Sequence, residues 1–132
     1  SVERVKMTQK PAALSWNGPS HRFRRVRFLD GKPVAIEEIW LDAEMASTID
    51  PDRVSQSLYR FYREELGLWI MRTEDSVALA PLPGWAVDQF PLAPGSPVGY
   101  VERRGWSQHD RQVEFSRTWF DPEMSRFVAR QG

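Results

Sequence analysis

Cysteine is missing from this sequence of 132 residues, and long apolar runs are missing as well. Without cysteine there can be no disulfide, no thiolate nucleophile and no cysteine-based metal site, which fits a reducing compartment. No stretch approaches the ~20 apolar residues of a membrane span, and the N-terminus lacks the basic and then apolar pattern of a signal peptide. We therefore expect a cytoplasmic protein that does not enter a membrane.

An excess of one charge sign is also missing. Lysine and arginine together number 18, and aspartate and glutamate together also number 18. A chain with balanced charge has no general attraction to nucleic acid or to anionic membranes. Histidine is scarce, because His21 and His109 are the only two, both in turn-like contexts, and no metal-ligand spacing occurs. The sequence predicts no metal and no cofactor.

The length of the chain is close to the usual size of one domain. We expect residues 1–132 to form a single domain around one core. The sequence begins with Ser1-Val2-Glu3 and not with an initiating methionine. We expect it to belong to a longer protein in which an N-terminal portion precedes this domain.

Residues 21–41 read HRFRRVRFLDGKPVAIEEIWL and predict a β-hairpin. Asp30-Gly31 suits a tight turn because glycine tolerates positive φ, and Pro33 suits the start of a strand. A two-residue loop would mix charged and apolar residues on both faces, so we prefer a three-residue loop of residues 29–31 with Gly31 in the bulge position. That register pairs Phe28 with Lys32, Arg27 with Pro33, Arg25 with Ala35 and Phe23 with Glu37.

In this register the two faces of the hairpin separate. The expected core face carries Val26, Phe28, Val34, Ile36 and Trp40. The other face carries Arg25, Arg27, Ala35 and Glu37, with Phe23 and Ile39 beside them. Such a charged face is either a solvated surface, where exposed ion pairs contribute only ~0–1 kcal/mol each, or an anion pocket, where paired guanidinium groups bind carboxylate or phosphate oxygens.

Residues 55–67, SQSLYRFYREELG, predict a helix. Apolar residues recur at helical spacing on one face, namely Leu58, Phe61, Tyr62 and Leu66. Ser55 or Ser57 can cap the start, and Gly67 can end the helix. Because unpaired N–H groups and the positive end of the dipole lie at a helix start, Ser57 could form a third wall of an anion pocket.

Three further strands are expected at residues 68–80, 98–106 and 112–120, with a short helix near residues 85–90. On the last strand one face carries Val113, Phe115 and Trp119, and the other carries Glu114, Ser116, Thr118 and Phe120. The order hairpin, helix, strand, short helix, hairpin predicts an α+β fold in which helices flank an antiparallel sheet.

Four segments occur together in one order and spacing: RRVRFLDGKPVAIEEIWL, SQSLYRFYREELGL, PGSPVGYVERRGW and VEFSRTWF. Over residues 20–128 this combination resembles the UTRA domain, the effector-binding domain of bacterial transcription regulators of the GntR/HutC family. The resemblance implies a chorismate-lyase-like fold that binds a small effector and forms a homodimer. It also implies a preceding winged helix-turn-helix DNA-binding domain, which is absent from this sequence.

The resemblance further implies which residues line the effector pocket. In sugar-phosphate-sensing members these are an Arg-x-Arg pair, a glutamate of the second hairpin strand, the Ser and Tyr of an S-x-Y motif and a glutamate of a late strand. The matching residues here are Arg25, Arg27, Glu37, Ser57, Tyr59 and Glu114. Phe120 stands at the pocket rim where a tyrosine is common, and Met45-Ala46-Ser47 stands where Pro-Gly-Leu often follows the first hairpin.

We therefore predict a regulatory domain that binds a small carboxylate- or phosphate-bearing metabolite and reaches operator DNA only through the absent domain. The alternative is a small lyase-like enzyme of the same fold that uses Glu37 and Glu114 for acid–base chemistry. Because an arginine-lined anion pocket needs no chemistry, we predict that the protein is not an enzyme. Direct nucleic-acid binding by the arginines at positions 22, 24, 25 and 27 is disfavoured, since strand alternation places them on two faces.

Overall fold

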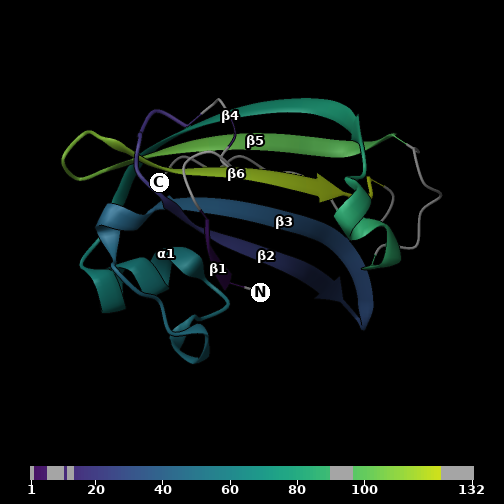
Figure 1. The fold of residues 1–132 in the computed structure, drawn as a ribbon. Helices are drawn as coiled ribbons and strands as arrows, with labels where there is room; N and C mark the ends of the chain where they lie inside the picture. The colour runs from purple at the N-terminus through teal and green to yellow at the C-terminus, as the bar shows by residue number, and fades with distance from the viewer. Residues whose placement is uncertain (1, 6–10, 12–13, 90–96, 123–132) are drawn as a thin grey trace.

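The computed structural model describes residues 2–5, 11, 14–89 and 97–122. In these residues six antiparallel strands form one sheet in the order β1-β2-β3-β6-β5-β4 (Figure 1). The strands are β1 (Val2–Val5), β2 (Ser20–Leu29), β3 (Lys32–Asp42), β4 (Ile70–Pro81), β5 (Pro97–Ser107) and β6 (Gln112–Phe120). The predicted α+β fold is confirmed. In the described part of the chain, no helix is long and apolar enough to cross a membrane.

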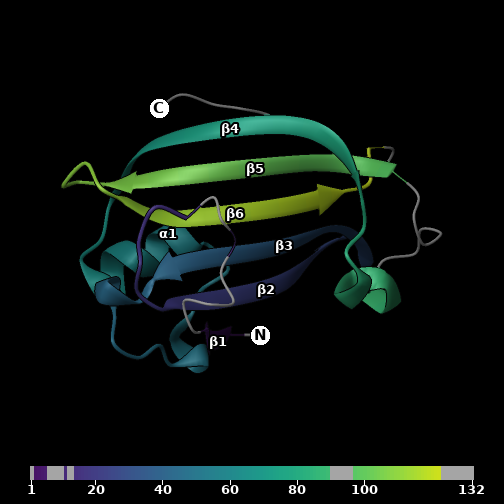
Figure 2. The same ribbon diagram turned by 45° about the horizontal axis from the view of Figure 1, so that its top comes forward.

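Short helices lie at the two ends of the sheet (Figures 1 and 2). At one end, the 3-10 helices Ala43–Met45 and Pro51–Arg53 lead into α1 (Leu58–Phe61) and a π-helical turn (Tyr62–Leu66). The 3-10 helix Gly84–Gln89 lies at the other end. The α-helix is therefore shorter than predicted, although Ser57 caps it and Gly67, with a φ of 63°, ends the helical segment as expected.

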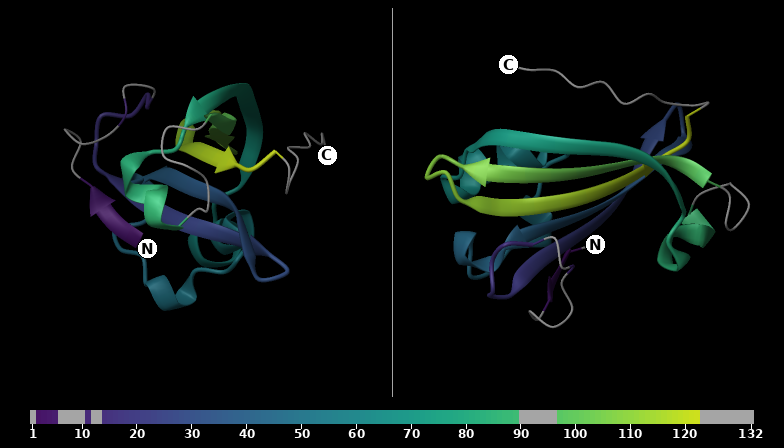
Figure 3. Two further views of the ribbon diagram at one scale, coloured as in Figure 1. Left: turned by 90° about the vertical axis from the view of Figure 1, so that its right-hand side faces the viewer. Right: turned by 90° about the horizontal axis from the view of Figure 1, so that it is seen from above.

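The sheet is strongly twisted and curved (Figure 3), and apolar residues pack on both of its faces. On the face toward α1 the buried cluster consists of Phe23, Ile39, Leu41, Leu58, Phe61, Tyr62, Leu68 and Val113. On the opposite face, Leu82 and Ala86 cover Ile36, Val98 and Trp119, whereas Leu14 and Trp16 cover Trp40 and Phe115. Since α1 covers only one end of its face, the rest of that face can line a cavity.

The turn of the first hairpin differs from the prediction. Leu29 pairs with Lys32, so Asp30 and Gly31 form a two-residue loop. Both turn residues have the positive φ, 50° and 77°, that a type I′ turn requires. The predicted three-residue loop and its strand pairs are wrong, because this turn type matches the right-handed twist of the strands.

A bulge explains why the two-residue loop still separates the two faces. Arg27 pairs with Ala35 while Phe28 pairs with Pro33, which leaves Val34 as an extra residue of β3. Beyond the bulge the pairs are Arg25 with Glu37 and Phe23 with Ile39. The predicted charged face therefore forms, but by different pairs. Phe28, predicted in the core, is 64% exposed.

A second bulge changes the faces of β6. Gly105 pairs with Glu114 and Trp106 pairs with Gln112, so Val113 is the extra residue. Val113 packs in the cluster on the α1 side of the sheet. The prediction that it shares a face with Phe115 and Trp119 is therefore wrong.

Candidate functional site

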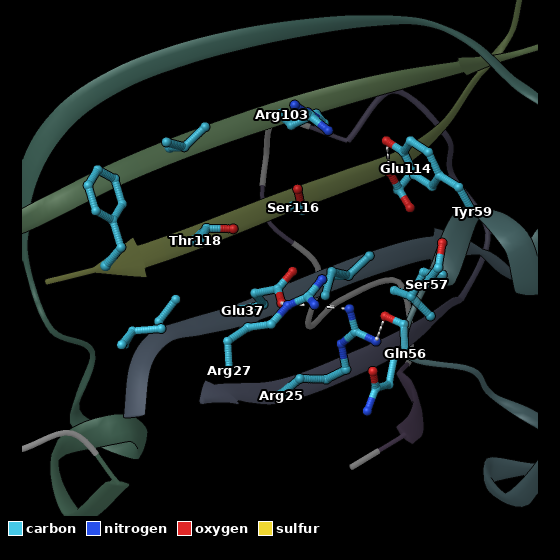
Figure 4. A pocket seen from close by; sticks show the side chains of 16 residues that line it. Arg25, Arg27, Glu37, Gln56, Ser57, Tyr59, Arg103, Glu114, Ser116 and Thr118 are labelled. Carbon is cyan, nitrogen blue, oxygen red and sulfur yellow. Dashed lines mark hydrogen bonds and ion pairs between the residues drawn. The ribbon is translucent and has the colours of Figure 1, made fainter. Parts of the chain in front are cut away.

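A cavity of about 730 Å³ lies between the sheet and the segment that starts α1 (Figure 4). Its volume falls within the usual range for sites that bind small molecules. Sixteen residues line it: Arg25, Arg27, Val34, Ala35, Glu37, Ile39, Gln56, Ser57, Leu58, Tyr59, Val101, Arg103, Glu114, Ser116, Thr118 and Phe120.

Rows of cross-strand partners from β2, β3, β6 and β5 organise the floor of the cavity. The row nearest the hairpin turn consists of Arg27, Ala35, Phe120 and Gly99. The next row consists of Arg25, Glu37, Thr118 and Val101, and the third of Phe23, Ile39, Ser116 and Arg103. Glu114 lies in the fourth row, between Leu41 and Gly105. The cavity therefore runs from an apolar end at Phe120 to a buried carboxyl group.

Two arginines share one carboxylate on the β2 and β3 side of the cavity. The Nε of Arg27 donates to Glu37 Oε1 at 2.5 Å, and Arg25 lies 3.6 Å from the same oxygen. Arg25 also donates to the backbone carbonyl of Gln56 at 3.0 Å, which ties β2 to the residues before α1. Within the described residues, the buried Nε of Arg25 has no hydrogen-bond partner. This wall carries more positive than negative charge.

Ser57 lines the cavity beside this wall, at the start of α1. Its hydroxyl oxygen accepts a hydrogen bond from the backbone N–H of Arg60 at 3.3 Å, so its first role is that of a helix cap. The helical segment that Ser57 starts continues through the π-helical turn to Leu66, so the positive end of its dipole lies beside the cavity.

A buried carboxyl group forms the opposite end of the cavity. Glu114 is 2% exposed, and its two oxygens accept hydrogen bonds from Tyr59 at 3.0 Å and from Tyr62 at 2.5 Å. Burial raises the pKa of Glu114 above its ordinary value, while the two hydroxyl donors oppose that rise because they stabilise the ionised form. Burial, followed by the neighbouring carboxylate, also raises the pKa values of Tyr59 and Tyr62.

Arg103 is a cavity residue that the sequence prediction missed. It makes a bidentate pair with Asp75 of β4, at 2.7 and 3.0 Å, and lies opposite Ser116 in the strand register. The bond to Asp75 is the main reason that the pKa of Arg103 is raised. Alternation along β5 could have grouped Gly99, Val101 and Arg103, but only the pairing with β6 shows that this group faces the cavity.

All seven residues predicted for the site lie around this one cavity: Arg25, Arg27, Glu37, Ser57, Tyr59, Glu114 and Phe120. Their binding of a ligand remains a prediction. The histidines lie elsewhere, His21 bonded through Nε2 to the carbonyl of Ala46 at 2.6 Å and His109 in the turn between β5 and β6. Among the described residues, no group of three or more acidic or histidine side chains is placed to hold a metal ion.

Comparison with known proteins decides the family. The model of the UTRA domain matches residues 2–126. The chain belongs to the UTRA domain family. It is 45% identical over 129 residues to the HTH-type transcriptional regulator SmoD of Agrobacterium fabrum, a match that covers 96% of this chain and 55% of SmoD. It is 24% identical over 107 residues to the HTH-type transcriptional regulator YydK of Bacillus subtilis, covering 81% of this chain and 45% of YydK.

Solved structures share the fold of this UTRA domain. The ligand-binding domain of a GntR-family transcriptional regulator from Bordetella bronchiseptica superposes with a TM-score of 0.84 at 18% identity, covering 100% of this chain and 87% of that one. The effector-binding domain of the Bacillus subtilis trehalose repressor superposes with a TM-score of 0.79 at 17% identity, covering 100% and 95%. The chain spans about half the length of the curated relatives that it matches.

Proposed function

We propose that this UTRA domain binds a small anionic metabolite in the cavity beside α1. In the full-length protein, binding would modulate the affinity of an N-terminal winged helix-turn-helix domain for its operator DNA. Such a regulator would act in the cytoplasm. The observation that carries the proposal is the wall in which Arg25 and Arg27 share a single carboxylate, Glu37.

Charge counting supports an anionic ligand at this wall. Two guanidinium groups and one carboxylate leave one unbalanced positive charge at this wall, while the carboxyl group of Glu114 lies at the opposite end of the cavity. Arg103 adds none, because Asp75 already neutralises it. A carboxylate or phosphate oxygen placed against Arg25 and Arg27 would balance the excess and accept charge-assisted hydrogen bonds, each worth roughly 1.5–3 kcal/mol.

The remaining polar groups suit the uncharged part of the same ligand. Ser116 and Thr118 offer hydroxyls on the floor of the cavity, and Ser57 and Gln56 offer polar groups on the wall above it. Glu37 and Glu114 can accept hydrogen bonds from ligand hydroxyl or amino groups. A small metabolite with one anionic group and several hydroxyl or amino groups would use this distribution fully.

The enzyme alternative receives less support from the arrangement of the two carboxylates. Glu37 is held by two arginines and Glu114 by two tyrosines. These partners hold both carboxylates in place as hydrogen-bond acceptors, an arrangement that suits ligand binding and needs no proton transfer. Stabilisation of the protein by a metabolite without turnover would support the sensor, whereas steady product formation would support the enzyme.

The test is a thermal-shift screen of phosphosugars, small carboxylates and amino-acid catabolites, followed by calorimetric titration of any ligand that stabilises the domain. Arg27→Ala should weaken binding of that ligand by roughly one to two orders of magnitude without unfolding the domain. Arg63→Ala, at an exposed position outside the cavity, is the matched control. Equal affinity of Arg27→Ala and the wild type would refute the proposed anion site.

We also propose that the domain forms a homodimer, because a regulator of two-fold symmetric DNA sites needs matching symmetry. Strand β4 is at the edge of the sheet and exposes Met71, Val77 and Leu79, each at least 60% accessible. Exposed apolar residues on an edge strand favour association with another chain. Sedimentation equilibrium at tens of micromolar should give a dimer, and replacing Leu79 with Lys should give a monomer.

A further inference from the structure

Gly99 and Phe120 are cross-strand partners at the apolar end of the cavity. The tip of the Phe120 ring lies directly over Gly99, because a Cβ atom added to Gly99 would fall within 2.6 Å of the ring carbons Cε1, Cε2 and Cζ. Real Cβ atoms do not approach other carbons so closely. The position of the Phe120 ring therefore depends on the missing side chain at residue 99.

The neighbouring strand on the other side of β6 offers the ring a second position. A Cβ atom at residue 99 would turn the ring about χ1 and away from β5. Phe120 also pairs with Ala35 of β3, on the other side of β6. Ala35 lines the cavity and is small. A ring leaning toward β3 would lie over Ala35 and fill this end of the cavity.

We propose that Gly99 is a specificity-determining residue of this UTRA domain. Because Gly99 has no Cβ, the Phe120 ring can lie over β5. This position of the ring leaves open an apolar recess, which is lined by Phe120, Val34, Ala35 and Val101. The recess selects effectors that carry an apolar group or face beside their anionic group. This inference rests on the proposed function, since the anion is held by the arginine wall.

The strand register fixes the spacing between the two subsites. Arg27, Ala35 and Phe120 are successive partners in one row, so the anion wall and the recess are two strand spacings apart. Neighbouring strands are about 4.8 Å apart, which gives about 10 Å between the backbones that carry Arg27 and Phe120. A molecule with an anionic group and an apolar group separated by a few bonds can reach both subsites.

The position of the ring can be tested without a ligand by NMR of the domain. In the wild type the ring current of Phe120 should shift the Gly99 Hα resonances upfield, and Phe120→Leu should remove that shift. In Gly99→Ala the ring should move, and the Ala35 methyl resonance should shift upfield instead. Gly84→Ala is the matched control, because a Cβ there meets no atom within 4 Å. The inference would be overturned if the Gly99 Hα resonances are not shifted upfield in the wild type and do not change in Phe120→Leu.

The role in specificity is tested with two carboxylates of equal charge, acetate and 3-phenylpropionate, titrated by the same NMR signals. In the wild type, 3-phenylpropionate should bind at least about tenfold more tightly than acetate, as expected for an apolar group in a fitted pocket. Gly99→Ala should reduce that advantage to about threefold or less, and the double variant Gly99→Ala/Phe120→Leu should restore it. Both carboxylates should weaken equally in Arg27→Ala.

The outcomes separate the two proposals. If Gly99→Ala leaves the ratio of the two affinities unchanged while Arg27→Ala weakens both carboxylates, the specificity role fails and the proposed function stands. If Arg27→Ala leaves the affinity of both carboxylates unchanged, or neither of them binds, the proposed anion site is refuted. In that case a role of Gly99 in effector choice fails with it, and the NMR shifts still decide whether Gly99 holds the ring in place.

Discussion

The hydrogen bond between Tyr62 and Glu114 allows a quantitative prediction, because both groups are buried and their partners are known. Tyr62 is 0% exposed and donates to Glu114 at 2.5 Å. Tyr62→Phe removes this donor and leaves the ring in place. A hydrogen bond to a charged group contributes roughly 1.5–3 kcal/mol. At about 4 °C per kcal/mol for a domain of this size, the melting temperature at neutral pH should fall by roughly 6–12 °C.

The loss should depend on pH in a defined direction. Burial raises the pKa of Glu114 in the folded state, so the stability linked to this group is complete below its unfolded pKa and is lost as pH rises through the folded pKa. Tyr62 opposes the rise by stabilising the ionised form. Tyr62→Phe should therefore raise the pKa of Glu114 further. The deficit of the variant should grow between the ordinary glutamate pKa of 4.5 and neutral pH.

Urea denaturation of the wild type and the variant near pH 4.5 and near pH 8 measures this difference. Tyr100→Phe is the matched control, since its hydroxyl also donates to a carboxylate, Glu102, at 2.8 Å but in a partly exposed position. The control should lose clearly less stability. A deficit of Tyr62→Phe that is the same at both pH values, or no larger than that of Tyr100→Phe, would refute the view that Tyr62 stabilises the ionised form of buried Glu114.

Three further predictions concern the hairpin turn, a surface ion pair and the cavity. Gly31→Ala should destabilise the domain by about 1–2 kcal/mol, because Gly31 has a φ of 77°; an unchanged urea midpoint would contradict this. Arg111→Met should lower the free energy of unfolding by about 1–2 kcal/mol, because it removes a partner of the buried Asp42 carboxylate. The loss is smaller than for a fully buried pair since Arg111 is half exposed, and calorimetric unfolding measures it. Arg103→Gln should weaken effector binding less than Arg27→Ala does, since Asp75 already neutralises Arg103. Titration of the two variants with the effector identified by screening measures this, and a larger loss in Arg103→Gln would contradict the prediction.

The sequence alone determined which side chains share a face of a strand. Extended backbone has a period of two, so Arg25 and Arg27 had to point the same way within the unbroken strand β2. Whether Glu37 of β3 joins their face depends on the hairpin register. The same rule grouped Glu114 with Phe120 on β6. These groupings within β2 and within β6 needed no knowledge of neighbouring strands, and they account for four of the seven residues of the predicted site.

Only the tertiary structure decided the register and the contents of the cavity. The extra residues Val34 and Val113 interrupt the alternation, and a bulge depends on pairing with another strand, which no local pattern reveals. Arg103 lines the cavity because β5 pairs with β6. The sequence alone allows many other strand orders. The place of Phe120 over Gly99 depends on the same pairing, since the space for the ring exists only where two distant segments meet.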